Sequence, residues 1–110
     1  RQNAQLSSLS EITSIATSLG AKQVARHAYE SCFTHEVISH VVSDLDAVEA
    51  SLHFLANHRV LVEPACGASL SALLKPIDFL ADKKNILIVV CGGAGVSIEQ
   101  LTAWKERLIS

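Results

Sequence analysis

The residues best suited to chemistry lie in a glycine-rich segment, Cys91-Gly92-Gly93-Ala94-Gly95, which follows an apolar run and precedes a helix start. Glycines let the backbone approach a ligand, and a helix N-terminus attracts anions. The segment therefore predicts either a cofactor contact or a tight turn that needs positive φ. It does not match the G-x-G-x-x-G or P-loop patterns of nucleotide sites. Cys91 is either a small buried hydrophobe or a nucleophile, and a nucleophilic thiol needs an electropositive neighbourhood.

A second candidate begins at Glu63, directly after the apolar run 60–62, and continues as Pro64-Ala65-Cys66-Gly67-Ala68-Ser69. Ligands in open α/β sheets bind at the carboxyl ends of strands, so a carboxylate here would face the same crevice as Cys91. The alternative is a carboxylate that satisfies backbone donors at a helix start. We expect Cys66 to pack rather than to bind a ligand.

Other reactive side chains form no recognisable constellation. The histidines are scattered and lack the i, i+4 spacing of zinc-binding helices, so no metal site is predicted. No Ser-His-Asp arrangement has sequence support, and no lysine lies in surroundings typical of a desolvated Schiff-base lysine. The residues considered are His27, His35, His40, His53, His58, Lys22, Lys75, Lys83, Lys84 and Lys105.

The hydrophobic pattern that must position these residues is α/β. Strands are predicted over 36–42, 59–62 and 85–91, and the last is continuously apolar, as in a parallel sheet buried on both faces. Alternation of helices and strands predicts a layered parallel sheet with flanking helices. Three short strands leave open edges, so we expect the chain to be part of a larger domain. Helices are predicted over 10–19 (ended by Gly20), 21–32, 43–57, 69–74 and 97–108.

Two helix starts carry clear capping signals. Ser43 is followed three residues later by Asp46, and Ser97 by Gln100, which predicts both serines as N-caps. In the last helix, the predicted buried stripe is Ile98, Leu101, either Trp104 or the aliphatic stem of Lys105, and Leu108.

The composition argues against several classes of protein. The 110 residues are 49% hydrophobic and 18% charged, which argues against a disordered segment. A net charge of −2 predicts no nucleic-acid partner. The longest apolar run, 86–91, is too short for a membrane span, and the first six residues lack the apolar stretch of a signal peptide. Three cysteines without a C-x-x-C pair suit a reducing compartment, so a cytoplasmic location is expected.

Taken together, residues 62–68 and 88–93 resemble the C-terminal part of the L-serine dehydratase/L-threonine deaminase family, as does the stretch 11–20. The resemblance runs from about Leu9 to Leu108. These are pyridoxal-phosphate enzymes of fold type II, acting in amino-acid catabolism. The resemblance implies that residues 1–110 are the C-terminal segment of the cofactor-binding large domain.

The resemblance also implies roles for individual residues. Cys91 matches the thiol that faces the pyridine nitrogen of the cofactor, and Gly92 and Gly93 match the turn beside the ring. Glu63 matches a carboxylate near the substrate face. A thiol holds a pyridinium proton less firmly than a carboxylate, which suits an elimination that needs no long-lived carbanion. The segment Ala94-Gly95-Val96 departs from the Ser-Asn pair that is frequent in the family, which leaves substrate choice open.

The family's Schiff-base lysine, and the loop that holds the cofactor phosphate, belong to an N-terminal part that this sequence lacks. No catalytic residue is therefore expected in this chain, which alone should be inactive. Its expected partner is that N-terminal part, covalently joined or as a second chain, within a homodimer. A bound monovalent cation is left open. The alternatives are a non-catalytic fragment or association module that folds on a partner chain, and a small independent anion-binding domain.

Overall fold

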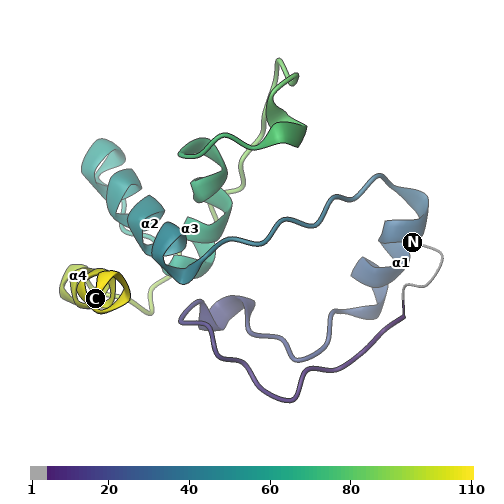
Figure 1. Cartoon of the computed structure of the whole chain (residues 1–110), viewed down its shortest axis with the longest axis horizontal. Coiled ribbons are helices and arrows are strands. Elements are labelled where there is room, and N and C mark those ends of the chain that lie inside the picture. Colours follow the sequence, from purple (N-terminus) through teal and green to yellow (C-terminus); the bar gives the residue numbers. More distant parts are fainter. Residues whose placement is uncertain (1–4) are drawn as a thin grey trace. The chain divides into compact units, whose positions relative to one another are not determined.

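A computed structural model of the protein describes residues 5–110 and divides the chain at Val41 into two compact units (Figure 1). The unit that ends at Val41 contains a short 3-10 helix, η1 (Thr17–Leu19), and one α-helix, α1 (Arg26–Thr34). The second unit contains three α-helices: α2 (Asp44–His58), α3 (Pro64–Leu70) and α4 (Ile98–Ile109). Two further 3-10 helices, η2 (Ser71–Leu73) and η3 (Asp78–Leu80), follow α3. None of the helices among residues 5–110 is long and apolar enough to cross a membrane.

In the first unit, helices are shorter than the sequence predicts. Of the helix expected over 10–19, only η1 forms, and it ends at Gly20 as expected. The next helix begins at Arg26 rather than at residue 21. The reason is that the Lys22 carbonyl accepts a hydrogen bond from the Leu9 amide at 2.8 Å, which holds this stretch to a neighbouring segment.

The capped helices of the second unit match the sequence closely. The Ser43 hydroxyl accepts a hydrogen bond from the Asp46 amide at 3.1 Å, and α2 ends at His58. The Ser97 hydroxyl accepts from the Gln100 amide at 3.2 Å, which begins α4. These caps satisfy amides that have no partner inside the helix, so they can be predicted from local sequence alone.

The packing centre of this unit is α2, which contacts both α3 and α4. Val48, Cys66 and Leu101 are fully buried there, one from each helix. The Lys105 ammonium and the Glu49 carboxylate, 3.1 Å apart, link α4 to α2. The predicted stripe of α4 is correct at Leu101 but wrong at Ile98, which is half exposed at the open first turn of the helix.

Gly67 sets the close approach of α2 and α3. A Cβ at this position would collide with the Ala47 carbonyl oxygen and the Ser51 hydroxyl of α2. The helix start predicted at residue 69 is wrong, because α3 begins at Pro64. Pro64 suits the first helical position because its missing amide hydrogen needs no partner there. Gly67 lies within α3 because the backbones of α2 and α3 are in direct contact where the two helices cross.

None of the three predicted strands is formed within residues 5–110. A strand requires a neighbour that receives its backbone hydrogen bonds, and these segments find none within the part of the chain that is described. Several of their apolar side chains lie in the open: Val41 is 88%, Leu87 90% and Val89 67% exposed, whereas Val62 is fully buried. The predicted layered sheet is therefore absent from the described residues, whose regular structure is helical.

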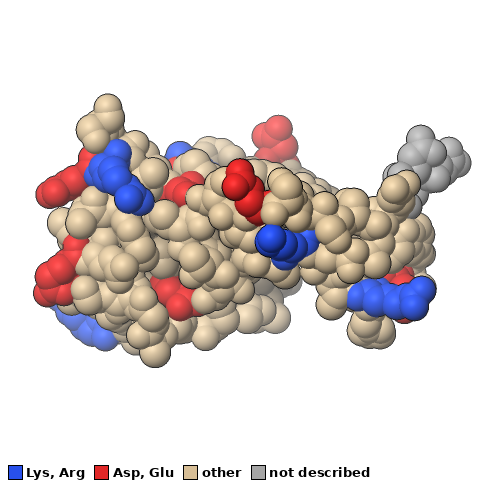
Figure 2. All heavy atoms as spheres, turned by 90° about the horizontal axis from the view of Figure 1, so that it is seen from below, with Lys and Arg blue, Asp and Glu red and all other residues tan. Residues whose placement is uncertain are grey.

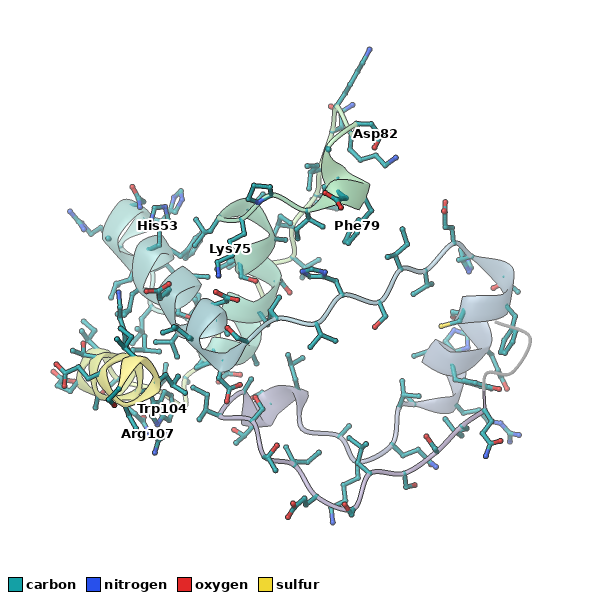
Figure 3. The ribbon with its side chains drawn as sticks, in the orientation of Figure 1. His53, Lys75, Phe79, Asp82, Trp104 and Arg107 are labelled. Carbon is teal, nitrogen blue, oxygen red and sulfur yellow. The ribbon has the colours of Figure 1, made fainter. Side chains whose placement is uncertain are left out.

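Figure 2 shows acidic and basic residues interspersed over the visible face, as the small net charge suggests. Lys75, labelled in Figure 3, pairs with Asp46 of α2. Hydrogen bonding between them lowers the pKa of Asp46 and raises the pKa of Lys75.

Candidate functional site

Glu63, the residue that precedes α3, is the point where the two candidate segments meet. Its backbone is extended, with φ −82° and ψ 163°, and its amide donates a hydrogen bond to the Gly92 carbonyl at 3.1 Å. Its own carbonyl accepts hydrogen bonds from the amides of Cys66 and Gly67, both at 2.9 Å. Backbone bonds therefore hold Glu63 to the glycine turn on one side and to the first turn of α3 on the other.

The glycine turn adopts a backbone that other residues rarely accept. Gly92 has φ 84° and Gly93 has φ 118°, both in the region that favours glycine. At Gly93 an added Cβ would also collide with the Glu63 carboxyl group. At Gly92 an added Cβ would meet no atom within 4 Å, so open space adjoins the turn at that point. The turn requires positive φ, as one of the two sequence interpretations stated.

The two cysteines of the site lie in different surroundings. Cys66 is fully buried in the core with Ala50, Val62 and Leu70, as predicted for a packing residue. Cys91 is exposed. Hydrogen bonding with the Cys66 thiol raises the pKa of Cys91, and the nearby Glu63 carboxylate adds to the effect. Cys91 therefore carries a neutral thiol near pH 7, which is a poor nucleophile because the thiolate is the reactive form.

The structure thus brings Glu63, Cys91, Gly92 and Gly93 together, although residues 5–110 form no sheet that could position them. Ser51, a fully buried serine whose hydroxyl lies 3.3 Å from the Glu63 carbonyl, was not among the predicted site residues. One signal could have found it: Ala47, Ala50 and Ser51 form a small-residue face on α2 that suits a close helix crossing.

The remaining candidates stay apart from this site. All five histidines are exposed. Within residues 5–110, no cluster of three or more His, Cys, Asp or Glu could hold a metal ion. A shallow hollow of about 130 Å³ lies between α2 and the segment that begins with η2, but its Asp46 and Lys75 neutralise each other. Its lining residues are Asp46, Glu49, Ser71, Leu74 and Lys75.

Comparison with known proteins supports one family. A model of the family described as pyridoxal-phosphate dependent enzyme matches residues 1–92. The L-serine dehydratase of Dictyostelium discoideum is 45% identical over 97% of this chain and 32% of its own length. The human L-serine dehydratase/L-threonine deaminase is 38% identical over 94% of this chain and 34% of its own length.

A solved structure is similar in fold as well as in sequence. The crystal structure of a fungal L-serine ammonia-lyase from Rhizomucor miehei matches 94% of this chain with a TM-score of 0.84 and 30% identity. This chain covers 34% of that protein. The chain therefore spans about a third of the length of the relatives that it matches.

Proposed function

The chain belongs to the family of pyridoxal-phosphate-dependent enzymes, and on that basis we propose that it is the C-terminal segment of an L-serine/L-threonine ammonia-lyase. The complete enzyme converts L-serine to pyruvate and ammonia, or L-threonine to 2-oxobutyrate and ammonia. Relatives with these names align with nearly the whole chain, which supports the proposal. The observation that carries it is the Glu63–Gly92 hydrogen bond, because it joins in one site the two segments that carry the resemblance.

The residues of the site fit the pyridine ring of the cofactor. The turn at Gly92 and Gly93 has no side chains, and open space adjoins Gly92, so a flat ring can approach the backbone closely. Cys91 is exposed beside this turn and carries a neutral thiol. We assign Cys91, Gly92 and Gly93 to the ring edge and Glu63 to the support of the turn.

When bound, pyridoxal phosphate would withdraw electrons from the substrate Cα and so ease removal of the Cα proton, whose electron pair then expels the β-hydroxyl group. The role of this chain's residues is to orient the cofactor and to tune how strongly its ring withdraws electrons. A neutral thiol cannot supply the negative charge that would hold a proton on the ring nitrogen, so Cys91 favours the unprotonated ring. The Glu63 carboxyl group lies against Gly93 and limits how the turn can move. The proton-transferring lysine belongs to the remaining part of the enzyme, and no catalytic residue is assigned in this chain.

The exposed apolar segments support the need for that remaining part. Leu87 and Val89 lie in a run that is typical of a buried parallel strand, yet both are largely exposed. We propose that segment 85–91 pairs with strands of the complete large domain, which restores the layered sheet of fold type II. The complete enzyme is further proposed to be a cytoplasmic homodimer, and dialysis against monovalent cations would test whether one is bound.

The assignment of Cys91 is tested in the complete enzyme by Cys91→Ala and Cys91→Ser. Pyruvate formation from L-serine measures turnover, and cofactor fluorescence measures affinity. Serine keeps a neutral hydrogen-bonding group, so Cys91→Ser should retain most activity. Cys91→Ala should lower turnover about tenfold, since it leaves the ring nitrogen without a partner, a loss of about 1.4 kcal/mol. Unchanged turnover and affinity in Cys91→Ala would remove the proposed role.

A second candidate function is an association module that folds on a partner chain without contacting a cofactor. The exposed apolar run at 86–90 favours it. Intact mass and absorbance of the purified protein separate the two. A larger species that carries a cofactor adduct on lysine supports the lyase, whereas a stable complex without cofactor absorbance supports the module.

A further inference from the structure

Ser51 connects the core of the second unit to the proposed site. Its side chain is fully buried on α2, and its hydroxyl donates to the Ala47 carbonyl at 3.0 Å. The same hydroxyl lies 3.3 Å from the carbonyl of Glu63. A serine hydroxyl has one hydrogen, so the two oxygens share it. The first contact is the ordinary back-bond of a helical serine, whereas the second crosses to another segment.

The crossing contact reaches the glycine turn through the backbone of one residue. Ser51 contacts the carbonyl of Glu63, and the amide of Glu63 donates to the carbonyl of Gly92 at 3.1 Å. Gly92 directly follows Cys91. Gly67 keeps α3 close enough to α2 for this link, because any Cβ there would strike both Ala47 and Ser51. The link therefore runs from α2 to the cysteine without an intervening flexible side chain other than that of Ser51.

We propose that Ser51 is a positioning residue that acts through Glu63 to hold the turn at Gly92 and Gly93 against the cofactor ring. This inference rests on the proposed function. It predicts that the hydroxyl affects the order of the turn and the affinity for the cofactor more than it affects the stability of the fold.

A matched control lies on the next helical segment. Ser71 of η2 is also a buried serine, and its hydroxyl donates at 2.8 Å to the carbonyl of Ala68, three residues earlier in the chain. Ser71→Ala therefore removes a buried hydroxyl without touching Glu63. The two alanine variants differ in the crossing contact, so any difference at the turn comes from that contact.

The experiment uses the complete enzyme, both with cofactor and after its removal. Hydrogen exchange followed by mass spectrometry reports the Glu63 and Gly93 amides in the cofactor-free protein. Fluorescence titration with pyridoxal phosphate gives the cofactor Kd. Ser51→Ala should speed exchange at Glu63 about fivefold and raise the Kd about fivefold, the size expected for one hydrogen bond. Ser71→Ala should change both by less than about twofold. Ser51→Cys, which keeps the volume but donates weakly, should behave like Ser51→Ala.

Equal behaviour of the Ser51 and Ser71 variants would overturn the inference, as would wild-type exchange and affinity in both Ser51 variants. The proposed function fails in a different way. If the wild-type enzyme does not bind pyridoxal phosphate, the lyase assignment is wrong, and the exchange rates of the cofactor-free protein still decide whether Ser51 orders the turn.

Discussion

Two apolar regions of the second unit differ in how far their side chains are buried. The α2–α3 crossing is made of small residues, and Ala50, Ser51 and Cys66 are all buried there. Segment 85–91 is more continuously apolar, yet Leu87 is 90% exposed. The difference is one of available neighbours. Helices satisfy their own backbone and need only a side-chain face to pack, whereas a strand must also find a backbone partner. From this segment, Ile88 packs on the core cluster and the Cys91 thiol contacts Cys66.

The strongest test of this contrast compares two leucines. Leu101→Ala removes a fully buried side chain between α4 and α2 and should lower the free energy of unfolding by about 2–5 kcal/mol. Leu87→Ala removes an exposed side chain and should change it by less than about 0.5 kcal/mol in the 110-residue chain. Urea denaturation followed by circular dichroism measures both.

The Leu87→Ala variant also tests the proposed sheet of the complete enzyme. In the complete enzyme Leu87→Ala should become clearly destabilising, because the proposed strand pairing buries that side chain. If Leu87→Ala remains neutral in the complete enzyme, segment 85–91 is not a buried strand there.

A pair of glycines provides the next test. Gly67→Ala places a Cβ against the backbone of α2 and should destabilise the chain by about 1–3 kcal/mol through overpacking. Gly92→Ala meets open space and carries only the cost of its positive φ, about 1 kcal/mol. In thermal unfolding, Gly67→Ala should therefore have a lower Tm than Gly92→Ala. The reverse order would contradict a close approach of α2 and α3 at Gly67. In the complete enzyme, Gly92→Ala should weaken cofactor binding more than Gly67→Ala does.

The smallest expected effect concerns the Asp46–Lys75 pair at the edge of the crossing. Its hydrogen bond lowers the pKa of Asp46 below the usual 3.8, so the pair stabilises the fold above that pH. That contribution is lost as the pH falls through the lowered pKa of the folded state. Asp46→Asn should therefore reduce the loss of stability on acidification from about pH 6 to about pH 3. An unaltered acid dependence in Asp46→Asn would show that the pair contributes nothing.

The sequence predicted the two capped helix starts more accurately than it predicted how the site residues are held together. Ser43 and Ser97 were identified correctly because a cap involves residues only three apart. Glu63, Cys91 and Gly92 were grouped on the assumption of adjacent strands, and they do lie together, but through a single backbone hydrogen bond. The helix start at Pro64 was missed because Gly67 is typical of a turn, and only the position of α2 explains a glycine inside that helix.

The sequence by itself determined the family, the two helix caps and the burial of Cys66, since each depends on local residue types or on motif resemblance. Tertiary structure decided the upward shift of the Cys91 pKa, the link from Ser51 to Glu63 and the absence of strands among residues 5–110. Each of these depends on which distant group supplies a hydrogen-bond partner. Periodicity can show that a segment is apolar or extended, but only packing determines which backbone or thiol lies within reach of it.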